Sequence, residues 1–136
     1  MPHARGQFDV SISPDETSES TDTTLDMMSI RKIFHGDLEA SSSGLMLTAT
    51  TDIADSAGYV AMERVIGVLY GRTGSFMLQH SGTMNRGVPS LAVTVVPDSG
   101  TDDLQGISGS LAIIITDGTH YYDFEYTLPE DRDAAN

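Results

Sequence analysis

The chain has 136 residues, which is the size of one domain that can bury its own apolar core. It contains no cysteine, and this excludes disulfides, thiolate metal sites and a cysteine nucleophile. Its 20 acidic and 7 basic residues give a formal net charge of −13, so nucleic acid and anionic membrane surfaces are poor partners, because phosphate binding needs a basic face.

We expect no signal peptide at the N-terminus. Residues 1–6 are not followed by an apolar run of the kind that a signal peptide needs. No stretch approaches the roughly 20 apolar residues of a membrane-spanning helix. We therefore expect a cytoplasmic protein.

Alternating apolar and polar residues predict strands along almost the whole chain. The segment 13–23 is rich in Ser, Thr, Pro and acids, so we expect a loop there. We expect a single domain over residues 5–128, followed by an acidic disordered tail at 129–136. The predicted strands are 5–12, 24–38, 44–52, 57–71, 73–84, 89–97, 107–116 and 119–128.

The segment 57–84 reads as a long hairpin. The run Gly71-Arg72-Thr73-Gly74 predicts a tight turn with Arg72 and Thr73 as its two-residue loop. Antiparallel pairing then brings alternate residues of the two strands to one face. That face is apolar except for one carboxylate and one imidazole. Its members are Tyr59, Ala61, Glu63, Val65 and Leu69, with Phe76, Leu78, His80 and Met84.

A second hairpin is predicted near the end of the chain. Asp117-Gly118 suits a type I′ turn and separates the apolar strand 107–116 from the strand 119–128. Eight strands with short connections favour a closed antiparallel β-barrel, because closure removes exposed strand edges. A two-sheet sandwich is the alternative.

Five motifs in order resemble a family of small bacterial proteins known only as a domain of unknown function. The resemblance covers about residues 5–128. It implies an antiparallel barrel similar to allene oxide cyclase and the dirigent proteins, and it implies no established activity. The motifs are Phe34-His35-Gly36-Asp37-Leu38, Gly58-Tyr59-Val60-Ala61-Met62-Glu63, Gly71-Arg72-Thr73-Gly74-Ser75-Phe76, Gln79-His80-Ser81-Gly82 and Val96-Pro97-Asp98-Ser99-Gly100-Thr101.

Glu63 and His80 are the candidate functional pair. We expect them at the polar end of an apolar cavity lined by Phe76, Leu78, Tyr122 and Tyr126, which His120 could also line. Burial would raise the pKa of Glu63, and the imidazole could hold or share its proton. The alternative is a structural polar pair with satisfied hydrogen bonds. We expect no cofactor and no metal.

Other motifs give weaker signals. His35 with Asp37 forms a minimal metal motif, and Asp98, Asp102 and Asp103 could form a calcium loop, but both sets are typical of solvated surface. No nucleophile elbow and no phosphate-binding loop occurs in the sequence.

Three function classes stay open, and the sequence does not decide whether the protein is an enzyme. The first is a barrel that binds a small apolar or amphipathic molecule. The second is a cofactor-independent isomerase or cyclase that uses Glu63 and His80. The third is a structural protein that acts through its outer surface. An outward apolar face of Val60, Met62, Ile66 and Val68 predicts a homo-oligomer, a dimer or a trimer.

Overall fold

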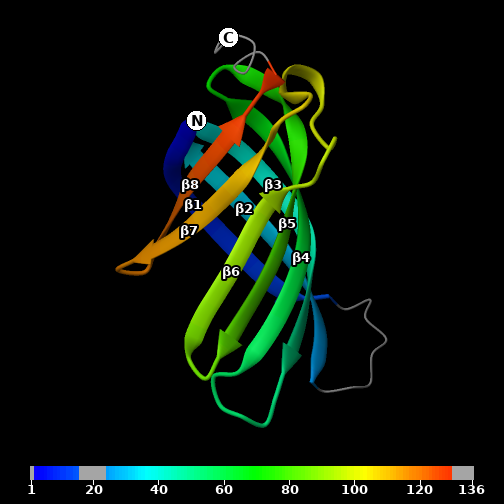
Figure 1. Ribbon diagram of the computed structural model, residues 1–136, viewed down its shortest axis with the longest axis vertical. Helices are drawn as coiled ribbons and strands as arrows, with labels where there is room; N and C mark the ends of the chain where they lie inside the picture. Colours follow the sequence, from blue (N-terminus) through cyan, green and yellow to red (C-terminus); the bar gives the residue numbers. More distant parts are fainter. Residues whose placement is uncertain (1, 16–23, 130–136) are drawn as a thin grey trace.

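Eight antiparallel strands close into one barrel in the computed structural model, which describes residues 2–15 and 24–129 (Figure 1). Each strand pairs with the next along the chain, and β1 pairs with β8 to close the ring. The predicted barrel is confirmed and the sandwich is wrong. Residues 130–136 of the predicted tail and 16–23 of the predicted loop lie outside the described residues, whereas residues 13 and 14 of that loop belong to β1. The elements are β1 (His3–Pro14), β2 (Leu25–Gly36), β3 (Leu38–Thr50), β4 (Ala57–Leu69), β5 (Arg72–Asn85), β6 (Val88–Val95), the 3₁₀ helix η1 (Asp102–Leu104), β7 (Ser108–Thr116) and β8 (Thr119–Thr127).

The β4–β5 turn lies two residues earlier than predicted. Leu69 pairs with Arg72, so the two-residue loop is Tyr70-Gly71 and not Arg72-Thr73. Both loop residues have positive φ, 46° and 78°, which is the requirement of a type I′ turn. Tyr70 tolerates this left-handed conformation although it is not glycine. The Asp117-Gly118 turn has φ values of 51° and 80° and confirms its prediction.

Strand β3 begins at Leu38, six residues before the predicted start at 44. The serines between 41 and 43 have little strand propensity, so the pattern indicated a loop there. In the structure they pair with β2 and β4 at once, for example Ser42 with Lys32 and with Val65. Two flanking strands therefore hold the segment extended, and tertiary pairing outweighs propensity.

One half of the barrel interior is filled by packed side chains. This packed half lies toward the β2–β3 and β4–β5 turns, where η1 adds the buried Leu104. The rings of Phe76 and Phe124 stack with their centroids 5.5 Å apart. The core consists of Ala4, Phe8, Phe34, Leu38, Val65, Leu69, Phe76, Leu78, Val93, Val95, Leu104, Ile107, Leu111, Tyr122, Phe124, Tyr126 and Leu128.

The wall of the barrel is weakest between β6 and β7. In the described part of the chain, Thr94 and Ser110 are the only register pair that joins these two strands. By contrast, β4 pairs with β5 along its whole length, from Ala57 to Leu69. Figure 1 shows β6 and β7 diverging from their point of contact.

Candidate functional site

Among the residues that the structure describes, four polar or charged side chains are buried inside the barrel, and we call them the Glu63 cluster. They are Lys32, Ser42, Glu63 and His80, with exposed fractions of 6%, 7%, 0% and 3%. They come from β2, β3, β4 and β5, which are consecutive neighbours in the wall. Because strand residues alternate between faces, each side chain points inward from its strand. The predicted inward placement of Glu63 and His80 agrees with this geometry.

The carboxylate of Glu63 is the centre of the cluster. Its Oε1 accepts hydrogen bonds from Lys32 Nζ at 2.9 Å and His80 Nε2 at 2.6 Å. Its Oε2 accepts one from Ser42 Oγ at 2.6 Å. The Lys32 ammonium also lies 5.2 Å from the centroid of the Phe8 ring, within the range of a cation–π contact. Three donors therefore converge on one buried anion.

The pKa of Glu63 is lowered to about 2, against the prediction that burial would raise it. Burial does act in the raising direction and is the largest single influence. The hydrogen bond from His80, the charge of Lys32 and the hydrogen bond from Ser42 act together in the opposite direction and outweigh it. Glu63 is thus a carboxylate and not a proton donor at neutral pH.

A cavity of about 230 Å³ occupies the other half of the barrel interior. Every one of the eight strands contributes at least one lining residue, so this space is the lumen of the barrel, and we call it the lumen cavity. Lys32 and His80 lie in its lining, and Glu63 lies behind them. The lining consists of Phe8, Val10, Ile12, Ile30, Lys32, Met46, Tyr59, His80, Leu91, Ile113, Ile115 and His120.

The structure places four of the predicted lining residues elsewhere. Phe76, Leu78, Tyr122 and Tyr126 are buried in the packed half of the interior, and none of them lines the lumen cavity. They face inward as predicted, but at the other end of the barrel. His120, a further candidate from the sequence analysis, does line the lumen cavity.

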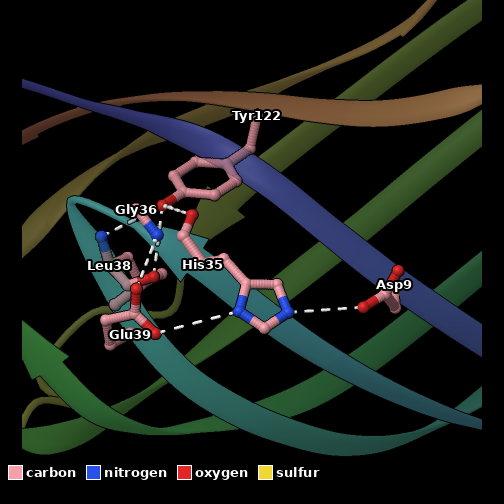
Figure 2. Close-up of polar contacts among 6 residues, drawn as sticks. All are labelled: Asp9, His35, Gly36, Leu38, Glu39 and Tyr122. Atoms are coloured by element: carbon pink, nitrogen blue, oxygen red, sulfur yellow. Dashed lines mark hydrogen bonds and ion pairs between the residues drawn. The ribbon is translucent and has the colours of Figure 1, made fainter.

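The hydroxyl of Tyr122 is committed to the β2–β3 turn (Figure 2). It accepts a hydrogen bond from the backbone N–H of Leu38 at 3.0 Å and donates to the carbonyl of His35 at 2.9 Å. Burial raises the pKa of Tyr122 to about 12, so the hydroxyl keeps its proton. A methyl group at Gly6 would overlap the backbone carbonyl oxygen of His35 and come within 2.8 Å of the Tyr122 hydroxyl oxygen, which explains the glycine there. Tyr122 is a structural residue.

A surface cluster surrounds His35 on the outside of the same turn (Figure 2). His35 Nε2 lies 3.3 Å from Asp9 Oδ2, and its Nδ1 lies 3.9 Å from Glu39 Oε2. Asp37 instead accepts a hydrogen bond from the backbone N–H of Arg5, which is the main reason for its lowered pKa. Over residues 2–15 and 24–129, no group of three or more His, Asp or Glu side chains is arranged to hold a metal ion.

Lys32 and Ser42 belong to the cluster, and the sequence did not identify them. Lys32 stands between Ile30 and Phe34 on the inward face of β2, so a lysine on an apolar face was the available signal. Ser42 had no such signal, because its strand was not predicted.

The outer face of β4 is exposed and apolar at the four predicted positions, and Arg64 lies among them. The exposed fractions are 52% for Val60, 42% for Met62, 57% for Ile66 and 37% for Val68. On the neighbouring strand, Leu45 pairs with Met62 and Leu47 pairs with Val60, and both leucines are about half exposed.

The chain matches one protein family along most of its length. The family model described as "Protein of unknown function (DUF3224)" covers residues 4–126, so the chain belongs to this family. A crystal structure of a DUF3224 protein of unknown function from Shewanella oneidensis MR-1 is 44% identical, with a TM-score of 0.89. That match covers 94% of this chain and 97% of the other. No curated protein matches the chain.

These matches confirm a family of unknown function with a barrel fold. Among the described residues, no helix has the length and apolar character needed to cross a membrane.

Proposed function

We propose that this member of the DUF3224 family binds a small, largely apolar ligand in the lumen cavity. The observation that supports this most is that all eight strands contribute to one cavity. An eight-stranded barrel has an interior that side chains can fill or that can hold one small ligand. Here the packed half follows the first pattern, and the lumen cavity follows the second.

The size and lining of the lumen cavity define the kind of ligand. At roughly 30 Å³ for each water-sized atom, about 230 Å³ holds a molecule of about eight non-hydrogen atoms. The walls are aliphatic and aromatic, with few polar groups. A small number of polar groups in an apolar pocket is typical of sites that orient a small molecule.

A proton-transfer enzyme is the second candidate, and the Glu63–His80 contact favours it. A carboxylate that holds one ring nitrogen of a histidine orients the ring and supports positive charge on it, as in many acid–base sites. His80 would be the group that touches the substrate, and Glu63 would position it. An isomerase or cyclase, the class suggested by the resemblance to allene oxide cyclase, could use these two residues in these roles. We propose that the protein acts in the cytoplasm.

Filling the lumen tests the binding function. Ile113 lines the lumen cavity, whereas its neighbour Ile114 points outward and is 45% exposed. We expect Ile113→Trp to abolish binding of six-carbon probes, measured as amide chemical-shift changes on titration with hexanoate and hexan-1-ol. Ile114→Trp is the matched control and should bind them like the parent protein. Equal binding by both variants would show that the lumen cavity is not the site.

A natural ligand can be sought in the purified protein. Native mass spectrometry of the parent protein should detect a co-purified small molecule that the Ile113→Trp variant lacks. Turnover of that molecule, and its loss in His80→Gln, would instead support the enzyme.

A further inference from the structure

The lining of the lumen cavity differs in charge from the rest of the protein. Acids outnumber basic residues by 20 to 7 in the whole chain, yet within residues 2–15 and 24–129 no Asp or Glu lines the cavity. The polar side chains that do line it are Lys32, Tyr59, His80 and His120. Lys32, Tyr59 and His120 can each donate a hydrogen bond to a ligand, whereas His80 donates its Nε2–H to Glu63, so the cavity presents donors in an otherwise acidic protein.

The donors keep capacity for a ligand. The Lys32 ammonium carries three N–H groups, and the hydrogen bond to Glu63 at 2.9 Å uses one of them. Burial, and then the charge of Glu63, raise the pKa of Tyr59, so its hydroxyl keeps its proton. His80 uses Nε2 for Glu63, which leaves Nδ1 as its second polar atom.

We propose that the ligand is a small apolar carboxylic acid whose carboxyl group meets Lys32 and His80 in the lumen cavity. This inference rests on the proposed binding function and names its ligand class. A carboxyl group matches donors on Lys32 and Tyr59, and its hydrocarbon part matches the aliphatic walls. A cationic ligand would bring its charge next to Lys32.

Charge balance fixes the protonation of the bound state. Glu63 already neutralises Lys32 at 2.9 Å, so a second carboxylate needs another positive charge to offset the cost of its burial. An acid that enters as RCOOH brings this charge as a proton and can donate it to His80 Nδ1, the ring atom that the contact with Glu63 does not use. His120 and Tyr59 are the other titratable groups that face it from the lining.

Three probes of equal chain length test this class. Hexanoate, hexan-1-ol and hexylamine share a six-carbon chain and differ in the head group, and hexanoate has eight non-hydrogen atoms. We expect hexanoate to bind at least about tenfold more tightly than hexan-1-ol, as one charged hydrogen bond can provide, in amide chemical-shift titrations at one pH. Hexylamine should not bind.

Variants test whether the preference for hexanoate over hexan-1-ol depends on the donors Lys32 and Tyr59. Lys32→Met combined with Glu63→Gln removes both charges of the pair. In this double variant the dissociation constants of hexanoate and hexan-1-ol should lie within about threefold of each other. Arg31→Met is the matched control, because Arg31 is a cation on the same strand that points to the outside. It should keep the full preference. Tyr59→Phe leaves the Glu63 cluster intact, and it decides the question if the double variant does not fold. It should reduce the preference severalfold.

The outcomes separate the two proposals. Equal binding of acid and alcohol, or tighter binding of alcohol or amine, would overturn the carboxylic-acid class and leave ligand binding in place. An unchanged preference in both Tyr59→Phe and a folded double variant would also overturn it. Absence of binding by all three probes, with Ile113→Trp indistinguishable from the parent protein, would overturn the binding function itself.

Discussion

Glu63→Gln should destabilise the protein strongly at neutral pH and much less in acid. The variant keeps the size of the side chain and removes its charge, so Lys32 loses its buried counter-ion at 2.9 Å. The pKa of Glu63 in the folded protein is about 2, against 4.5 for the free side chain. At 1.36 kcal/mol for each pKa unit, ionised Glu63 contributes on the order of 3 kcal/mol to the free energy of unfolding at pH 7.

The sign follows from the direction of this shift. The pKa is lower in the folded protein than in the unfolded chain, so the stabilisation is present above about pH 5 and is lost as the pH falls toward 2. At pH 3 about 1.4 kcal/mol of it should remain. The difference in stability between the parent protein and Glu63→Gln should therefore shrink by about half or more between pH 7 and pH 3.

Urea unfolding of the two proteins at both pH values measures this difference. Glu39→Gln is a suitable control, because the Glu39 side chain is 62% exposed and glutamine keeps a side-chain oxygen for the hydrogen bond from the backbone N–H of Gly36. The stability of this variant should therefore change by less than about 0.5 kcal/mol. A difference for Glu63→Gln that stays constant from pH 7 to pH 3 would show that the carboxylate is not stabilised in the ionised form.

Two other predictions concern the packed half and the outer face. Tyr122→Phe removes the hydroxyl that bonds the backbone of Leu38 and His35, so we expect a loss of about 1–3 kcal/mol in urea unfolding with binding of six-carbon probes unchanged. Loss of probe binding without loss of stability would show that Tyr122 is part of the ligand-binding site. The homo-oligomer stays a prediction from the exposed outer face: we expect a dimer or trimer in sedimentation equilibrium and a monomer for the combined Val60→Lys and Met62→Lys variant. A monomeric parent protein at micromolar concentration would contradict it.

The sequence predicted which way side chains face better than where they lie along the barrel. The β4–β5 turn was misplaced by two residues, yet Glu63 and His80 still shared the inner face. A turn moved by two residues shifts the pairing by an even number of positions, and strand faces alternate with a period of two. The inward orientation of Glu63 and His80 was therefore predicted correctly although the predicted register was wrong.

The position, or height, of an inward side chain along the barrel axis could not be predicted from the alternation of residues. Phe76 and Tyr122 face inward like His80, but they lie in the packed half, and His80 borders the lumen cavity. Height depends on the stagger between all eight strands, and alternation within one strand carries no information on it. The same limit concealed the cluster, since the contact of Lys32 with Glu63 joins strands that are not neighbours.

The weak seam between β6 and β7 has a kinetic consequence. A barrel wall is a ring of hydrogen-bonded ladders, and such a ring yields first where the ladder is shortest. Thr94–Ser110 is the single register pair at this seam within the described residues, and Leu91 and Ile113 border the lumen cavity from its two sides. Separating these strands breaks little of the wall, so we expect the seam to open without global unfolding. Amide hydrogens of β6 and β7 should then exchange faster than those of β4, at rates that report how often the seam opens.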